Sequence, residues 1–488
     1  MTRTRLAVLS GDDIGRIREA TLELLEDTGV LVREPRARKL LTDAGARAVE
    51  RSDRLLLPSS LVKEAVGKAP KAWTWHARES RYDLRIGEGG RTKLGPGSSC
   101  TNYVDFPSGR ARMPTSDDAL RLLRLLDALP LVDICYTPVA DAHDGDLPPR
   151  CAEAATFVRD LENTSKPVVG PSFDGTMAKD ALDIAAILVG GREELRKRPT
   201  VAGYCDPVGP LIHDRNMTEM LIEYAAMGQP VFIVAADLAG ASAPATLAGL
   251  LVQQNAELLS GLLIAHLVNR DAPVILGTVS GALDMRTGSA VFGGPELGLT
   301  SIATVQLCHS YGLPCAAGGQ SDAKVHDAQA ALEKATTLLA SVLAGADLVD
   351  LFYGSYEGFN ATSVEQVVID HDIAAYAFRY AEGIEVNEET LALDVMREVG
   401  PGNSFLHGRR ALEHTMKWFR GEHALPMILD RRSRRAWSLA GERTLLQEAH
   451  ERAESILREH RPTPMAREVQ SEIEIALKRI FRETTRAA

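Results

Sequence analysis

The chain has 488 residues, of which 45% are hydrophobic, 5% aromatic and 25% charged. This length and composition predict a globular protein with one large core or two ordinary ones, and they exclude a disordered chain. The net charge of -11 disfavours non-specific binding to nucleic acid and is compatible with a cationic ligand.

The sequence gives no signal for a membrane span or for secretion. The longest apolar run, Leu258 to Val268, is broken by polar and small residues and is shorter than the ~20 residues that a span needs. The first residues, MTRTRLAVLSGDD, lack a long apolar segment followed by a small-residue cleavage site. We therefore expect a cytoplasmic protein that does not bind a membrane.

The cysteines and histidines do not form a metal-binding or disulfide pattern. The six cysteines are scattered without a CxxC pair, which argues against a disulfide framework and against a thiolate zinc site. The histidines, including His143 in the segment from Asp141 to Asp144, lack HExxH or similar spacing. We expect reduced core cysteines and no metal site.

The first ninety residues predict a helical or mixed extension. Asp12 to Gly29 and Pro35 to Ala44 read as helices, and the proline of the second segment suits a first helical turn. Pro58 to Pro70 begins with a serine in an N-cap position ahead of a short helix. A β-rich stretch at Ala72 to His76 is an alternative to the first strand of the next domain. We place this extension at residues 1–90.

Residues 91–380 alternate short β-rich segments with longer amphipathic ones. The eight predicted strands are Thr92–Pro96, Val132–Val139, Pro167–Pro171, Thr200–Tyr204, Pro230–Ala236, Pro273–Val279, Leu313–Ala317 and Asp347–Tyr353. Strands such as VFIVAA and APVILG are apolar at successive positions, as expected when both faces of a parallel strand are covered. Eight βα units predict an α/β fold of the closed (β/α)8 type, the TIM barrel.

The sequence is helical again after Phe378. Glu388 to Val399 ends at a GPG turn signal, and Glu442 to Glu459 reads as a charged amphipathic helix before the breaker HRPTP. There is no internal repeat and no low-complexity linker. We expect residues 381–488 to form a helical C-terminal extension packed on the barrel.

Several segments resemble one enzyme family. The longest extends from Ala243 to Lys324 and contains APATLAGLLVQQNAELLSGLLIAHLVN, APVILGTVSGALDMRTG and GLPCAAGGQSDAK. The others are LEKA at Leu332–Ala335, LVDLFYGS at Leu348–Ser355, EQVVIDHDI at Glu365–Ile373, LALDVMREVGPG at Leu391–Gly402 and KWFR at Lys417–Arg420. Together they resemble the trimethylamine methyltransferase family, corrinoid-dependent enzymes that take a methyl group from a methylated amine.

The resemblance implies methyl transfer to Co(I) of a corrinoid held on a separate protein. The chain itself would bind no cofactor tightly, and its partners would be a small quaternary amine and the corrinoid protein. We also expect a homo-oligomer. The founding enzymes carry pyrrolysine in a region that corresponds approximately to Gly318, Gly319 and Gln320, where this sequence has standard residues. Trimethylamine is therefore disfavoured as the substrate, and glycine betaine, proline betaine or carnitine is favoured. The candidate catalytic residues are Gly319, Gln320 and Asp237.

An aromatic cage is the expected binding site for such a substrate. A quaternary ammonium donates no N–H hydrogen bond, so it is recognised by aromatic faces that contribute ~0.5–2 kcal/mol each. Barrel active sites lie at the C-terminal ends of the strands. The aromatic candidates near those ends are Tyr103, Tyr204, Phe352, Tyr353 and Tyr356. The alternative is that these side chains fill the barrel or pack its loops.

Three polar residues complete the candidate substrate site. Asp206 and Asp237 directly follow predicted strands, where a carboxylate could face a cation or could cap the next helix. Arg286 could hold a substrate carboxylate bidentately or could pair with an acidic neighbour in its own loop.

Two other functions stay open. One is a corrinoid-independent lyase or hydrolase of a small cationic metabolite that uses Asp206, Asp237 or His326 as general acid or base, and the other is a binding protein without chemistry.

Overall fold

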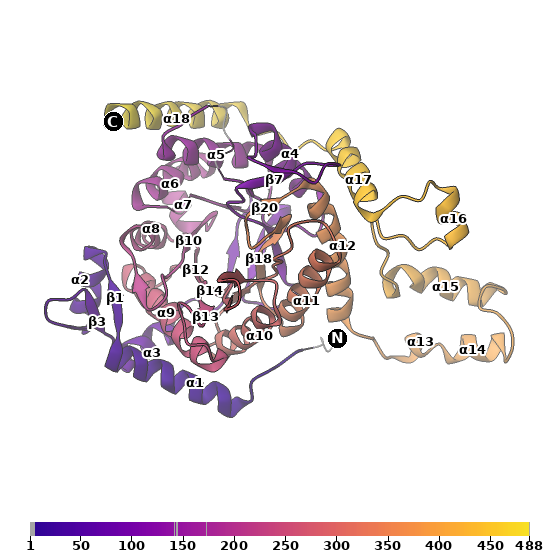
Figure 1. Ribbon diagram of the computed structural model, residues 1–488, viewed down its shortest axis with the longest axis horizontal. Helices are drawn as coiled ribbons and strands as arrows, with labels where there is room; N and C mark the ends of the chain where they lie inside the picture. The colour runs from indigo at the N-terminus through magenta and orange to yellow at the C-terminus, as the bar shows by residue number, and fades with distance from the viewer. Residues whose placement is uncertain (1–4, 141, 143–144, 172, 488) are drawn as a thin grey trace.

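A ring of parallel strands forms the centre of the protein, as the computed structural model in Figure 1 shows for residues 5–140, 142, 145–171 and 173–487. Seven strands form one sheet in the order β6-β18-β17-β14-β12-β10-β9, and every pair of neighbours is parallel. Their bounds are β6 Lys93–Pro96, β9 Val168–Val169, β10 Val201–Cys205, β12 Val231–Ala235, β14 Val274–Thr278, β17 Cys315–Ala317 and β18 Leu348–Tyr353.

The segment 132–139 closes the ring between the two edge strands. The Asp133 N–H donates to the Leu94 carbonyl of β6 at 2.8 Å, and the Cys135 N–H donates to the Pro167 carbonyl, just before β9, at 3.0 Å. We predicted a regular strand here, and that detail is wrong, because the segment bonds its neighbours at single positions and not in a continuous ladder. The (β/α)8 barrel itself is confirmed.

Helices surround the strands on the outside of the ring (Figure 1). They are α4 Ser116–Ala128, α5 Pro149–Asn163, α6 Gly175–Val189, α7 Arg192–Lys197, α8 Arg215–Ala226, α9 Leu247–Val268, α10 Pro295–Ser310, α11 Ala328–Ala344 and α12 Val364–Glu382. Among the described residues, α9 is the one helix long and apolar enough to cross a membrane by length and composition. Most of α9 is buried between the barrel and the N-terminal elements. This burial explains why the helix is apolar on all of its faces.

A tryptophan hairpin fills the N-terminal end of the barrel. Strands β4 Trp73–Trp75 and β5 Leu84–Ile86 pair antiparallel, with the short 3-10 turn η2 Ser80–Tyr82 before β5. Trp75 is fully buried, its indole N–H donates to the Thr200 carbonyl just before β10 at 3.0 Å, and its ring lies 5.5 Å from that of Phe232. The stretch at Ala72 to His76 is therefore a plug and not a barrel strand.

The remaining N-terminal elements pack against α9. They are α1 Gly11–Glu23, the π-helical turn η1 Leu24–Thr28, β1 Val30–Val32, α2 Pro35–Asp43, β2 Arg47–Ala48, β3 Arg54–Leu56 and α3 Ser59–Lys68. Strand β1 pairs with β3 and with β11 Ile212–His213, which belongs to a loop of the barrel. The Asn255 amide of α9 donates to the Thr21 hydroxyl of α1 at 3.0 Å, so a buried polar contact fixes this layer on the barrel.

Two small sheets border the C-terminal mouth of the barrel. The first has the order β19-β20-β7-β8, with β7 Asn102–Val104, β8 Ala111–Arg112, β19 Ser355–Tyr356 and β20 Ala361–Thr362. The second contains β13 Leu238–Ala239, β15 Gly281–Asp284 and β16 Ser289–Val291. Both sheets are built from chain that directly follows barrel strands, so they rise from the same end of the ring.

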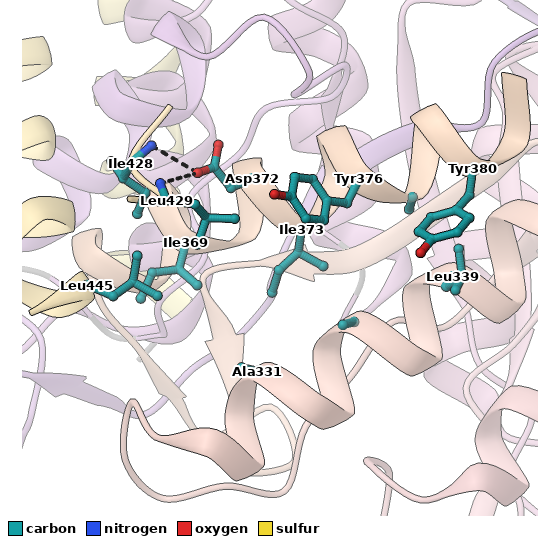
Figure 2. A pocket seen from close by; sticks show the side chains of 12 residues that line it. Ala331, Leu339, Ile369, Asp372, Ile373, Tyr376, Tyr380, Ile428, Leu429 and Leu445 are labelled. Atoms are coloured by element: carbon teal, nitrogen blue, oxygen red, sulfur yellow. Dashed lines mark hydrogen bonds between the residues drawn. The ribbon is translucent and has the colours of Figure 1, made fainter. Parts of the chain in front are cut away.

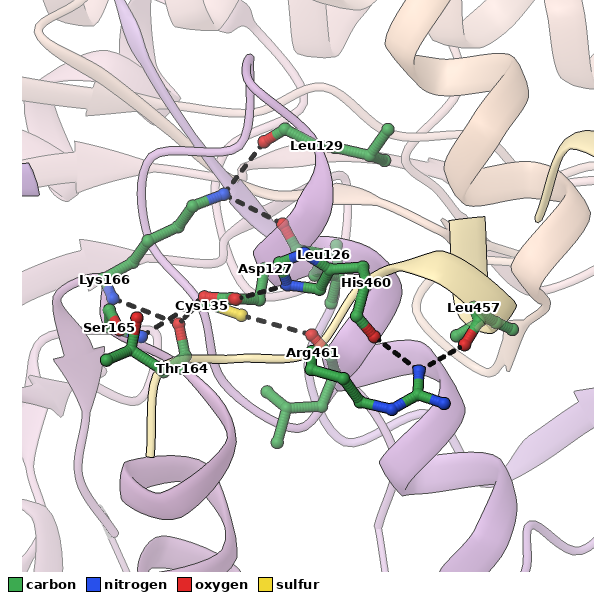
Figure 3. Close-up of polar contacts among 12 residues, drawn as sticks. Leu126, Asp127, Leu129, Cys135, Thr164, Ser165, Lys166, Leu457, His460 and Arg461 are labelled. Atoms are coloured by element: carbon green, nitrogen blue, oxygen red, sulfur yellow. Dashed lines mark hydrogen bonds and ion pairs between the residues drawn. The ribbon is translucent and has the colours of Figure 1, made fainter. Parts of the chain in front are cut away.

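The C-terminal extension packs on the barrel through its last two helices. These helices are α17 Leu445–Glu459, which lies against α12 and α4, and α18 Arg467–Ala487, which lies against α5 and α6. Between them, the His460 imidazole lies 2.7 Å from the Asp127 carboxylate of α4, which also accepts the Thr164 hydroxyl at 2.7 Å (Figure 3). The Lys166 ammonium donates nearby to the carbonyls of Leu126 and Leu129. The preceding helices α13 Glu388–Leu391, α14 Leu393–Val399, α15 Arg409–Glu422 and α16 Arg434–Leu439 stand away from the ring of helices (Figure 1).

Candidate functional site

An acidic residue and two tyrosines form a hydrogen-bonded network inside the barrel. Asp350 of β18 is buried and accepts hydrogen bonds from the Tyr136 hydroxyl, at 3.0 Å, and from the Tyr204 hydroxyl of β10. Its Oδ1 also accepts the Leu351 N–H at 2.9 Å. A side chain at Gly95 of β6 would overlap Asp350 Oδ1, so this strand position must be glycine for the carboxylate to fit. Strands β6, β10 and β18 and the segment 132–139 thus together position one carboxyl group.

Burial governs the charge of this network. The pKa of Asp350 is raised to about 6 because burial disfavours its charged form, and the hydrogen bonds from the two tyrosines and from the Leu351 N–H limit the rise. Burial and the charge of Asp350 raise the pKa of both tyrosine hydroxyls well above the usual value. At neutral pH the tyrosines are therefore donors, and Asp350 is mostly a carboxylate.

Several aromatic rings belong to the same region of the barrel as this carboxylate. The ring of Tyr204 is stacked on Phe232, with centroids 4.9 Å apart and planes at 26°. Phe359, from the loop between β19 and β20, packs against the cluster that fills the barrel, and Phe292 meets it edge to face at 5.0 Å. Leu351 and Phe359 have φ values of 60° and 74°. A left-handed backbone at such side chains is costly, and strain of this kind is found most often at functional sites.

Asp206 adds a second carboxyl group to the same end of the barrel. It follows Tyr204 by two residues, one position beyond the end of β10, and it lies near enough for its charge to raise the pKa of the Tyr204 hydroxyl. Its Oδ1 is buried without a hydrogen-bond partner among the described residues. Burial, with a smaller contribution from Asp214, raises the pKa of Asp206 to about 7. The group is therefore close to half ionised at neutral pH and is able to bind a cation or to exchange a proton.

Asp237 belongs to a different acidic pair. Its Oδ1 accepts from the Gln253 amide of α9 at 3.1 Å, and this amide also lies 3.2 Å from Glu257 Oε1. Asp237 and Glu257 are both almost fully buried, and they lie close enough to share a hydrogen bond, which requires one proton between them. Burial and the Asp237 charge raise the pKa of Glu257 to about 9. The pair lies between β12 and α9, while Asp350 lies inside the ring.

Phe352 and Tyr353 lie on the outside of the barrel wall. The register of β18 shifts between Val349 and Tyr353, and this irregularity ends the simple alternation of side chains along the strand. Both side chains are fully buried in the core between strands and helices. The Lys334 ammonium lies 4.2 Å from the Phe352 ring centroid and 3.2 Å from Asp370, so an internal cation already occupies that aromatic face.

The other predicted residues lie at separate places around the mouth. Tyr356 and Tyr103 are buried in the sheet of β7, β8, β19 and β20, where the Arg112 guanidinium covers the Tyr103 ring at 4.9 Å. Arg286 is at the tip of the β15–β16 hairpin, with its side chain 88% exposed, and it pairs with Asp284 of the same turn at 2.7 Å. This is the loop pairing that we kept open as the alternative for Arg286. His143, with Asp141 and Asp144, lies outside the described residues.

The predicted glycine and glutamine are packed tightly behind the mouth. A side chain at Gly319 would lie 3.0 Å from the Phe352 ring, and one at Gly318 would lie 3.1 Å from Leu297 of α10, so these positions give no open space above a substrate. Gln320 is fully buried, its Oε1 lies 3.4 Å from the Ser355 hydroxyl, and its amide nitrogen has no acceptor among the described residues. Within the same residues, no group of three or more His, Cys, Asp or Glu side chains is arranged to hold a metal ion.

Sequence reasoning missed Asp350, which is the centre of the network. A signal was present, because Asp350 is the one charged residue in the apolar strand LVDLFY, and a charge in such a strand needs buried partners. Tyr136 and Phe359 were not among the candidate site residues either. Their relation to Asp350 depends on three elements far apart in sequence.

Comparison with known proteins identifies the family. The family described as "Trimethylamine methyltransferase (MTTB)" matches residues 1–483 of the chain. The chain belongs to the trimethylamine methyltransferase family. It is 31% identical to the glycine betaine methyltransferase of Desulfitobacterium hafniense strain Y51 over 96% of its own length and 95% of that protein. It is 34% identical to the trimethylamine methyltransferase MttB of Methanosarcina barkeri, covering 94% and 92% of the two chains.

The fold of this trimethylamine methyltransferase family member is also found among solved structures. The crystal structure of the Methanosarcina barkeri monomethylamine methyltransferase MtmB aligns over 97% of this chain and 88% of that one, with a TM-score of 0.55 at 10% identity. At that identity the likeness shows the fold alone. The predicted family and barrel are therefore confirmed, and the family makes the chain a methyltransferase.

Proposed function

We propose that this methyltransferase moves a methyl group from a quaternary amine, such as glycine betaine or a related betaine or carnitine-type compound, to Co(I) of a corrinoid protein. The observation that carries the proposal is the Asp350 carboxylate, held inside the barrel by Tyr136 and Tyr204 in a region that also contains Phe232 and Phe359. A cationic group without hydrogen-bond donors is recognised by a carboxylate and aromatic faces together.

The chain supplies binding, orientation and exclusion of water. In the proposed complex the ammonium group lies over Asp350 and against Tyr204 and Phe359, with one methyl group directed toward the open mouth. The tryptophan plug seals the opposite end of the barrel, so the substrate enters and the methyl group leaves on the same side. The corrinoid, as a co-substrate on its own protein, supplies the cobalt nucleophile that accepts the methyl group. The tertiary amine then leaves neutral and weakens its attraction to Asp350, which favours product release.

The sequence positions near Gly318 to Gln320 support a quaternary substrate. They hold standard residues in place of the pyrrolysine of the trimethylamine enzymes, so an electrophilic imine is not available to handle a tertiary amine. One relative of this chain bears the name glycine betaine methyltransferase, although others at similar identity are named for trimethylamine. We further propose that the protein acts in the cytoplasm as a homo-oligomer with a corrinoid protein as partner.

A second candidate function is favoured by one observation. The pKa of Asp206, raised to about 7, suits a general acid or base at neutral pH. A corrinoid-independent reaction of a small cationic metabolite at the same mouth would use this group. Such a reaction would consume the substrate without cobalt.

Cobalt spectroscopy distinguishes the two candidates. The enzyme is incubated with glycine betaine, proline betaine, carnitine, choline and trimethylamine, each with cob(I)alamin, and methylcobalamin formation is followed by absorbance. We expect methylation with at least one quaternary amine and none with trimethylamine. The same incubations without cobalamin are analysed for products by mass spectrometry. No cobalt methylation from any quaternary amine would contradict the proposed function, and product formation without cobalamin would favour the second candidate.

A further inference from the structure

The segment 383–427, which contains α13, α14 and α15, has almost no core of its own. We call it the arm. It leaves the barrel at the end of α12, runs outward and returns before α16 (Figure 1). Every residue of the arm is described, and only Val395 and Ala411 are buried. Helices gain most of their stability in proteins from packing an apolar face, so isolated helices of 4, 7 and 14 residues are marginal in water.

The arm exposes a large amount of apolar side chain. Of the 23 large hydrophobic residues that are exposed among the described residues, ten lie in these 45 positions. Examples are Ile384, which is 85% exposed, and Met416, which is 64% exposed. Scattered apolar residues are normal on a protein surface, but a concentration of this kind marks an interaction site.

Several charged residues of the arm are paired with one another. Lys417 of α15 forms an ion pair with Glu389 of α13, and Arg410 lies 3.2 Å from Asp394 of α14. These contacts hold the outgoing and returning halves of the arm together. A partner that covers the exposed apolar side chains of the arm must present apolar surface as well.

The same chain presents such a surface at the base of the arm. A hollow of about 180 Å³ lies between α11, α12 and the chain that returns from the arm, and Figure 2 shows Leu339, Ile373, Tyr376 and Tyr380 along it. Asp372 anchors the returning chain by accepting the N–H groups of Met427, Ile428 and Leu429. Tyr380 is 65% exposed although it lines this groove.

We infer that the arm of one copy of this chain lies in the groove of a second copy, and that the exchange is reciprocal in a two-fold dimer. The arm starts at the end of α12, which lines the groove, and extends away from the barrel (Figure 1), so it does not cover its own groove. A buried aliphatic side chain removes on the order of 100 Å² from water, so the apolar residues of the arm could bury roughly 800 Å² per copy. This equals what one partner contributes to a stable interface of standard size. A two-fold exchange places the same two surfaces in contact twice.

Sedimentation of the full-length protein and of two charge variants tests this inference. The arm variant carries Leu412→Glu and Met416→Glu, and the groove variant carries Ala331→Glu and Tyr380→Glu; all four positions are exposed, so the monomer fold should survive. We expect the unmodified chain to sediment as a dimer of the 52.8 kDa chain at micromolar concentration. Each variant should dissociate at least 100-fold more readily, because it must bury charges in an apolar contact. Thermal unfolding of each variant verifies the fold.

Mixing the two variants tests the reciprocal pairing. A mixed dimer retains one intact arm and one intact groove that face each other, so the mixture should form dimers that neither variant forms alone. The matched control carries Met113→Glu and Ile475→Glu, two exposed apolar residues outside the arm and the groove, and should remain dimeric. A monomeric unmodified chain, a dimer that persists in the arm variant, or a mixture that stays monomeric would each overturn the inference.

Discussion

Replacing Asp350 with Asn separates the charge of the network from its shape. The amide oxygen can accept the Tyr204 hydroxyl, and the amide nitrogen can donate to the Tyr136 oxygen, whose own hydrogen is within reach of the Pro96 carbonyl at 3.2 Å. The variant should therefore keep both tyrosine hydrogen bonds and lose the one from the Leu351 N–H, which Asp350 Oδ1 accepts in the unmodified protein. Its missing feature is the negative charge that we propose to hold the ammonium group.

The magnitude follows from Coulomb attraction. For a cation about 5 Å from a carboxylate at an effective dielectric constant of about 20, the attraction is about 3 kcal/mol. We expect Asp350→Asn to weaken quaternary-amine binding by about 2–3 kcal/mol, or roughly 30- to 150-fold. Isothermal titration measures it, with the uncharged tert-butyl analogue of the same amine as a control ligand. The analogue should bind both proteins equally.

The same substitution should stabilise the free protein. Because burial raises the pKa of Asp350 to about 6, the proton on this carboxyl group stabilises the fold below about pH 4, and this contribution is lost as the pH rises through about 6. At pH 7 the unmodified protein pays this cost and the variant does not, so Asp350→Asn should unfold at a higher temperature. Unchanged amine affinity together with this stabilisation would refute the binding role and leave Asp350 as a purely internal group.

Three other substitutions test neighbouring contacts. Tyr204→Ala should weaken quaternary-amine binding by about 1–3 kcal/mol, because it removes an aromatic face and a donor to Asp350; titration at pH 8 measures the loss. Lys334→Met should lower the free energy of unfolding by about 3–5 kcal/mol, because it leaves the fully buried Asp370 carboxylate without its cation. Adding Asp370→Asn should restore part of this free energy, and chemical denaturation measures both changes. The raised pKa of Glu257 means that the folded protein holds this proton more tightly than the unfolded chain does, so the unmodified protein should lose stability as the pH rises from about 4.5 through about 9. Glu257→Gln should remove this pH dependence, and thermal unfolding across the same pH range measures it.

The sequence alone determined the family and the barrel. Apolar strands such as VFIVAA can lie only between two covered faces, and their alternation with amphipathic helices leaves a closed parallel barrel as the architecture. The segments between Ala243 and Arg420 carried the family resemblance. The barrel follows from local periodicity, and the family follows from short segments that match its sequences. A single chain displays both directly.

The tertiary structure decided which side chains share a site. Tyr204 and Asp206 are two residues apart at the end of one strand, so their nearness follows from sequence. Alternation from Leu348, which belongs to the cluster inside the barrel, also places Asp350 inside, but the irregularity that follows in β18 leaves Phe352 and Tyr353 outside, and no local pattern indicates where such a shift falls. Likewise, the meeting of Tyr136, Tyr204 and Asp350 joins segments up to 214 residues apart. Contacts between residues so far apart in sequence depend on how the ring of strands closes and on where a small residue such as Gly95 makes room for a side chain. Only the folded chain determines both.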